Sequence, residues 1–133
     1  MAYGTLQTDV LNTSTGIFST NNAYLGIAKA WVNYNGTTQT VNGSFNVSSV
    51  TYSTTGKYIV NFTTAMSNAN YSVAVTSSNT NGGSYTGTGS LFYASTSAAG
   101  ALTTTTCAVA FTGNNGLSTY ENPFNACVIV FSS

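Results

Sequence analysis

The fold of this chain is indicated most clearly by the stretch Ile27-Ala28-Lys29-Ala30-Trp31-Val32-Asn33-Tyr34. Its residues fall into two alternating sets, as in a β-strand, where successive side chains point to opposite faces of a sheet. One set comprises Ala28, Ala30, Val32 and Tyr34, and the other comprises Ile27, Lys29, Trp31 and Asn33. The stretch therefore predicts a strand, with Trp31 and Lys29 on the same face.

The same alternation recurs downstream of this strand. Ser44–Val50 places Phe45 and Val47 on one face, and Lys57–Phe62 aligns Tyr58, Val60 and Phe62. These two segments, separated by a Gly-containing turn, predict a hairpin. The pairs Asn35-Gly36 and Asn42-Gly43 are tight-turn signals that would bracket a short segment, Thr37–Val41.

Further strands are predicted at Tyr71–Val75, Leu91–Tyr93, Thr103–Phe111 and Asn125–Phe131. Thr63–Asn70, where Ala65-Met66 is a faint helical signal, is expected to be a single helical turn or a loop. About eight strands with regular turn signals predict an all-β fold, an antiparallel β-sandwich spanning residues 27–133.

Residues 1–26 are short, rich in turn residues and too few to build a core of their own. They contain two predicted brief strands, Thr5–Val10 and Gly16–Ser19. We interpret them as an N-terminal arm for docking and oligomerisation, on a neighbouring copy or a larger particle. The candidate docking residues are Tyr3, Leu6, Val10 and Phe18.

Charge is almost absent from the sequence. Only Asp9, Lys29, Lys57 and Glu121 are charged among 133 residues, and there is no histidine, whereas Ser, Thr and Asn supply 57 positions. Soluble domains normally carry about a quarter charged residues. A chain this neutral, yet rich in Tyr, Phe and Val, suggests a place inside a fixed assembly.

The same shortage argues against an enzyme. A Ser-His-Asp or Cys-His relay cannot be built without histidine, and the only carboxylate pair is Asp9 with Glu121. No cofactor and no metal site is expected, because several carboxylates or a Cys/His cluster would be needed. Cys107 and Cys127 are interpreted as two buried thiols, with a disulfide between adjacent strands as the alternative.

Composition also limits the partners. The net charge is zero, so the basic stripe that a nucleic-acid-binding protein needs is missing. No stretch approaches the 18 apolar residues of a membrane span. The N-terminus lacks the basic and apolar regions of a secretory signal, so we expect synthesis and assembly in a cytoplasm.

Two loops are candidate recognition surfaces. Asn79–Ser90 mixes Tyr, Ser, Gly and Asn, which antibody loops use for adaptable contacts around an aromatic anchor, and Asn114–Phe124 adds the only proline. The candidate receptor-binding residues are Asn79, Asn81, Tyr85, Thr86, Tyr120, Glu121 and Asn122. The alternative is that both are plain solvent loops. We interpret Trp31 as a core or subunit-interface residue in preference to a sugar platform.

Four ordered motifs resemble a known family. They are Ala28–Gly36, Gly43–Val50, Lys57–Met66 and Asn70–Val73. Together they resemble the C-terminal (knob) domain of tail-fibre-like virion proteins of tailed bacteriophages, of the marine and cyanobacterial phage type. The resemblance covers about residues 27–75. The opening segment Gly4–Val10 with Ser14–Gly16 is similar to short N-terminal segments of such proteins, and residues 79–124 match no motif.

The resemblance implies a homotrimer at the surface of a virion, in contact with other virion proteins of the tail or capsid. Its function would be host attachment by a short fibre or tip, with a host cell-surface glycan as the receptor class. Because only about 26 residues precede the module, the alternative is a capsid decoration protein held by the N-terminal arm. A third hypothesis, outside the phages, is a monomeric sugar-binding β-sandwich.

Overall fold

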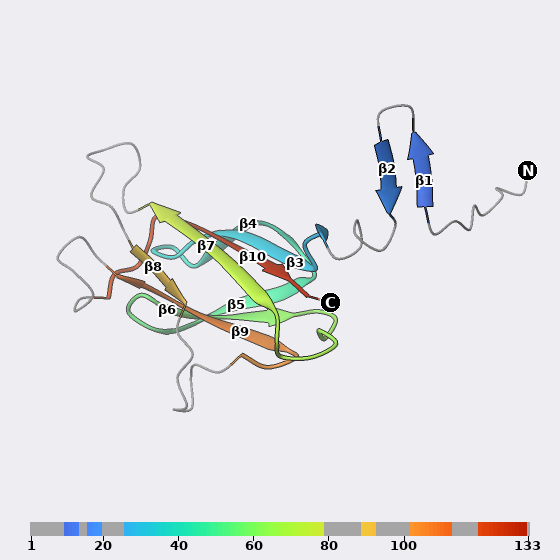
Figure 1. The fold of residues 1–133 in the computed structure, drawn as a ribbon. Helices are drawn as coiled ribbons and strands as arrows, with labels where there is room; N and C mark the ends of the chain where they lie inside the picture. Colours follow the sequence, from blue (N-terminus) through green and yellow to red (C-terminus); the bar gives the residue numbers. More distant parts are fainter. Residues whose placement is uncertain are drawn as a thin grey trace, which may run out of the picture.

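The computed structural model describes residues 10–13, 16–19, 26–78, 89–92, 102–112 and 120–132. Its described part is all-β, with two four-stranded antiparallel sheets that face one another (Figure 1). The first sheet has the order β4-β3-β10-β7 and the second the order β5-β6-β9-β8. The all-β fold predicted from alternation is confirmed.

The first sheet is formed by β3 (Ala30–Asn35), β4 (Thr40–Phe45), β7 (Ser72–Ser78) and β10 (Asn125–Phe131). The second is formed by β5 (Val47–Thr54), β6 (Lys57–Phe62), β8 (Gly89–Phe92) and β9 (Thr106–Thr112). The strands predicted from residues 27, 57, 71, 103 and 125 onward correspond to β3, β6, β7, β9 and β10. The predicted hairpin corresponds to β5 and β6.

One local prediction is wrong. Asn42-Gly43 is not a turn but lies within β4, and the chain reverses instead over residues 36–39, where Gln39 has a φ of 59°. The register of β3 against β4 shifts between Asn33, which pairs with Gly43, and Tyr34, which pairs with Val41. The Asn-Gly pair therefore marks a β-bulge within β4 and not a turn.

The predicted common face of Phe45 and Val47 is also wrong. Asn46 lies between them with a φ of 53°, and at this residue the chain leaves the first sheet and enters the second. The Asn46 side chain stabilises this crossing, because its Nδ2 donates to the carbonyls of Lys29 and Thr64 while its Oδ1 accepts from the Thr64 amide. Asparagine tolerates the left-handed conformation better than most residues do.

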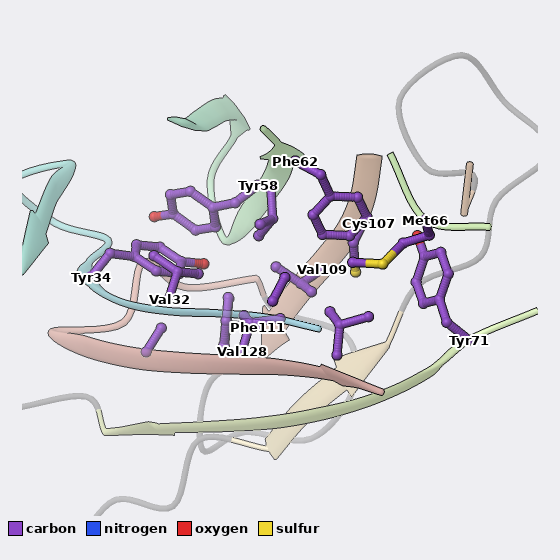
Figure 2. Packing of buried hydrophobic residues seen from close by; sticks show 14 residues of the cluster. Val32, Tyr34, Tyr58, Phe62, Met66, Tyr71, Cys107, Val109, Phe111 and Val128 are labelled. Atoms are coloured by element: carbon purple, nitrogen blue, oxygen red, sulfur yellow. The ribbon is translucent and has the colours of Figure 1, made fainter. Parts of the chain in front are cut away.

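The inward faces of the two sheets form one core. Tyr34 of the first sheet meets Tyr58 and Phe111 of the second edge-to-face, with ring centroids 5.2 and 6.4 Å away (Figure 2). Aromatic pairs in this arrangement contribute roughly 0.5–1.5 kcal/mol beyond the area they bury. Around them are the smaller buried residues Ala30, Val32, Val60, Cys107, Val109, Ala126, Val128 and Val130.

Beside this core, the loop predicted for Thr63–Asn70 closes one end of the molecule. The Met66 amide donates to the Thr104 carbonyl, and the Tyr71 hydroxyl donates to the Thr106 carbonyl at 2.6 Å. The Tyr71 ring packs against Phe62 with centroids 5.8 Å apart. The loop is therefore tied to the start of β9.

The predicted arm contains β1 (Val10–Thr13) and β2 (Gly16–Ser19), which pair with each other as a separate two-stranded sheet. The predicted strand over Gly16–Ser19 is present, whereas the earlier predicted strand meets the described residues only at Val10, where β1 begins. Tyr3 and Leu6 lie outside the described residues. Docking by the arm stays a prediction.

Two glycines provide a matched test of the turn geometry. Gly56 has a φ of 69°, and a Cβ there would lie 2.6 Å from the Phe111 carbonyl oxygen. A Cβ at Gly43 would lie an ordinary 3.5 Å from the Trp31 ring. We expect Gly56→Ala to lower the free energy of unfolding by at least about 2 kcal/mol, because strain and a backbone collision add, and Gly43→Ala to leave it nearly unchanged.

Urea denaturation of both variants measures this difference. Equal losses for the two substitutions would show that the β5–β6 turn is not packed against Phe111 in the way described.

Candidate functional site

The outer face of the first sheet carries an unusual amount of exposed apolar surface. Phe45, Trp31 and Ile129 are paired side by side across β4, β3 and β10, and Ala74 of β7 continues the line. The exposed fractions are 54% for Phe45, 41% for Trp31 and 36% for Ile129. We call these four residues the apolar row.

The row follows from the alternation that defines β3. Ala30, Val32 and Tyr34 are buried, so Trp31 and Asn33 must face outward. The core interpretation of Trp31 is therefore wrong, and the subunit-interface and sugar-platform interpretations remain. The indole ring lies over Gly43 of the neighbouring strand, where the missing side chain leaves room for it.

Polar side chains border the row on one side. Asn42 Nδ2 donates to Asn33 Oδ1 at 2.8 Å, and Asn33 Nδ2 donates to the Cys127 Sγ at 2.9 Å. Asn33 is paired with Gly43 and Cys127, and Thr76 is paired with Cys127 on the next strand. An apolar strip with a hydrogen-bonded polar border has the anatomy of a protein interface.

The two cysteines therefore lie in different places. Cys107 is buried in the core on β9, as predicted, but Cys127 is half-buried on the outer face of β10. They are free thiols on different sheets.

A pocket of about 380 Å³ adjoins the row at Phe45. Its lining combines apolar side chains with a few polar ones: Ile27, Ala28, Lys29, Phe45, Asn46, Thr64, Ala65, Met66, Ser67 and Ser132. Ile27 is 60% exposed beside it. The pocket brings together four separate segments of the sequence, so no single motif could have predicted it.

The predicted receptor residues have different outcomes. Asn79, Asn81, Tyr85 and Thr86 lie outside the described residues, so their role stays a prediction. Tyr120 is half-buried, with the Lys57 ammonium 4.3 Å from its ring centroid, and Glu121 is half-buried next to it.

The Asn122 side chain makes hydrogen bonds within the molecule, at a junction of three segments that we call the Asn122 junction. Its Oδ1 accepts the Gly56 amide at 2.7 Å and lies 2.9 Å from the Tyr58 hydroxyl, which is also 2.9 Å from the Gly36 carbonyl. The next residue, Pro123, accepts the Gly36 amide on its carbonyl. This junction fastens the segment before β10 to the turns of both sheets.

The buried titratable groups are held neutral. Burial raises the pKa of Tyr58 to about 12 and the pKa of the Cys107 thiol to about 12. Burial also raises the pKa of Tyr34 and of Tyr71 above the ordinary value for tyrosine. At neutral pH these hydroxyls are protonated and serve as hydrogen-bond donors or packing groups.

The described ranges hold neither a metal-ligand cluster nor a membrane-spanning helix. No group of three or more His, Cys, Asp and Glu side chains that could hold a metal ion occurs within them. The same part of the chain has no helix long and apolar enough to cross a membrane.

Comparison with known proteins finds no match for this chain among family models, curated proteins or solved structures. The resemblance to tail-fibre-like virion proteins therefore stays a prediction that rests on the sequence motifs quoted for it.

The internal role of Asn122 leads to a stability prediction. Asn122→Ala leaves the Gly56 amide without its acceptor, so we expect a loss of about 1–3 kcal/mol in the free energy of unfolding. Asn42→Ala removes one exposed hydrogen bond, and we expect it to cost less than about 0.5 kcal/mol.

Chemical denaturation of the two variants, compared with the unaltered chain, tests this expectation. If Asn122→Ala is as stable as Asn42→Ala, Asn122 is not a structural residue, and its predicted role in receptor binding regains its weight.

Proposed function

We propose that this chain is a structural, non-enzymatic surface protein of a tailed-bacteriophage virion. In this proposal it forms a short trimeric fibre-like or tip-like module for attachment to the host surface. The observation that carries the proposal is the apolar row, exposed on a sheet face of a chain that has only four charged residues. A free monomer would gain solubility from charge, whereas this chain exposes large apolar side chains instead.

The row is suited to contact between copies. Trp31 lies at its centre, flanked by Phe45 and Ile129, and the border on one side consists of the amides of Asn33 and Asn42 and the thiol of Cys127. Aromatic residues at the centre of a contact, surrounded by polar groups that exclude water, carry most of the energy of many protein interfaces. The subunit-interface interpretation of Trp31 is thus preferred over a sugar platform.

Host recognition is assigned to the opposite end from the pocket. The ends of β7 and β9, from which the predicted loops Asn79–Ser90 and Asn114–Phe124 start, lie beside the Asn122 junction, because the Phe124 amide donates to the Ser78 carbonyl and the Glu121 amide donates to the Phe111 carbonyl. In this proposal the loop around Tyr85 makes the receptor contact, with a host glycan as the receptor class, and the Asn122 junction holds the base of the second loop.

Immunogold electron microscopy of intact particles, with antibody against this chain, tests the location. We expect gold at the tail or its fibres. Gold over the head would contradict attachment and favour the alternative, a capsid decoration protein held by the N-terminal arm. The absence of labelled particles would contradict a virion protein altogether.

Association through the apolar row is tested with the same substitution, isoleucine to threonine, placed once in each sheet. Ile129→Thr alters the row, while Ile59→Thr alters the half-buried outer face of β6 in the other sheet. We expect a trimer for the unaltered chain, at least tenfold weaker association for Ile129→Thr and for Trp31→Thr, and unchanged association for Ile59→Thr. Light scattering over a concentration series measures the association.

A clean monomer of the unaltered chain at micromolar concentration would contradict the proposed trimer. Equal weakening by Ile129→Thr and Ile59→Thr would show that the row is not the contact surface.

A further inference from the structure

The β1–β2 hairpin needs a surface to pack on. Its two four-residue strands form a sheet that shares no strand pairing with the other two sheets. An isolated two-stranded hairpin is only marginally stable in water. Its sequence contains Val10, Leu11, Ile17 and Phe18, with Leu11 and Phe18 in register, and no charged residue within either strand. The hairpin is therefore a small, neutral, apolar element without a core of its own.

The pocket beside Phe45 has the matching chemistry. Two large apolar side chains at its rim, Ile27 and Phe45, are 60% and 54% exposed. Ala65 and Met66 extend the apolar lining, and Lys29 is the charged residue of the lining. An uncharged apolar partner would bury the apolar side chains of the rim and bring no charge of its own into the contact.

The pocket also lies where the chain arrives from the hairpin. Ile27 and Ala28 belong to its lining, and only residues 20–25 separate Gly26 from the end of β2 at Ser19. A connection of this length spans at most about 25 Å when fully extended. The hairpin is thus tethered near the pocket end of the sheets, and copies joined through their hairpins must bring these ends together.

We propose that this pocket is the docking site for the β1–β2 hairpin of a second copy of the chain. Within one chain, the hairpin stays unpaired with the strands of its own sheets, and the apolar rim of the pocket stays exposed. If the hairpin of one copy packs in the pocket of another, the hairpin gains a surface to pack on and the apolar rim of the pocket is covered. The inference rests on the proposed assembly of several copies, but it uses a surface other than the centre of the apolar row.

The test uses two variants of the full chain. Phe18→Asp places a charge in the hairpin, and Ala65→Glu places a charge at an exposed position in the pocket lining. We expect each variant to self-associate at least tenfold more weakly than the unaltered chain in sedimentation velocity. The matched controls Thr13→Asp, at the end of β1, and Thr51→Glu, on an exposed position of β5, should leave association unchanged.

A mixture of the two variants tests the exchange itself. The Ala65→Glu chain retains an intact hairpin and the Phe18→Asp chain retains an intact pocket, so one productive contact per pair remains possible. We expect the equimolar mixture to form pairs at a concentration at which neither variant associates alone. Circular dichroism of each variant checks that the β-structure is retained.

Failure of the mixture to associate, or unchanged association of Phe18→Asp, would overturn the exchange. If Ile129→Thr weakens association while Phe18→Asp and Ala65→Glu do not, assembly through the row stands and the hairpin contact falls. If the mixture associates but no virion carries the chain, the hairpin contact stands and the proposed function falls.

Discussion

The contact between Tyr34 and the pair Tyr58 and Phe111 is the constraint on which the rest of the structure depends. These rings join the two sheets. Tyr34 and Tyr58 are at inward positions of strands that alternate between buried and more exposed residues, whereas Phe111 belongs to β9, where residues on both faces are buried. Once Tyr34 is directed at the core, Trp31 must be directed at the outside. The same requirement brings the Tyr58 hydroxyl to the edge of the core, where Gly36 and Asn122 provide its acceptors. The core, the Asn122 junction and the exposed apolar row thus all follow from the inward orientation of these rings.

The outer surface is the feature from which the proposed function is argued. The first sheet exposes large apolar side chains bordered by amides, whereas β6 of the second sheet exposes Lys57, Ile59 and Asn61 only in part. The buried hydroxyl and thiol groups are neutral, since desolvation raises their pKa values. The proposed function therefore relies on contact and assembly at the outer surface.

The strands could be predicted from the sequence because alternation is a local property. β6 and β10 coincide with the predicted segments Lys57–Phe62 and Asn125–Phe131, and β3 and β7 differ from theirs only at the ends. The error at Asn42-Gly43 has a tertiary cause, because pairing with β3 and a bulge override a local turn preference. Alternation defines two faces of a strand but does not say which face is buried, so the pattern alone did not predict the exposure of Trp31. The signal for exposure was the presence of Lys29 and Asn33 on the same face.

The pocket assembles distant segments and had no signal in the sequence. Asn122 was predicted for its polarity in a loop, and only its contacts show that it is structural.

Asn46 gives the molecule a mechanical property as well as a crossing point. It lies between β4 and β5, donates hydrogen bonds to the carbonyls of Lys29 and Thr64, and lines the pocket. A restraint applied at this corner therefore acts on the adjoining ends of both sheets. A partner bound in the pocket would contact the ends of both sheets at once, and the two sheets would become harder to separate.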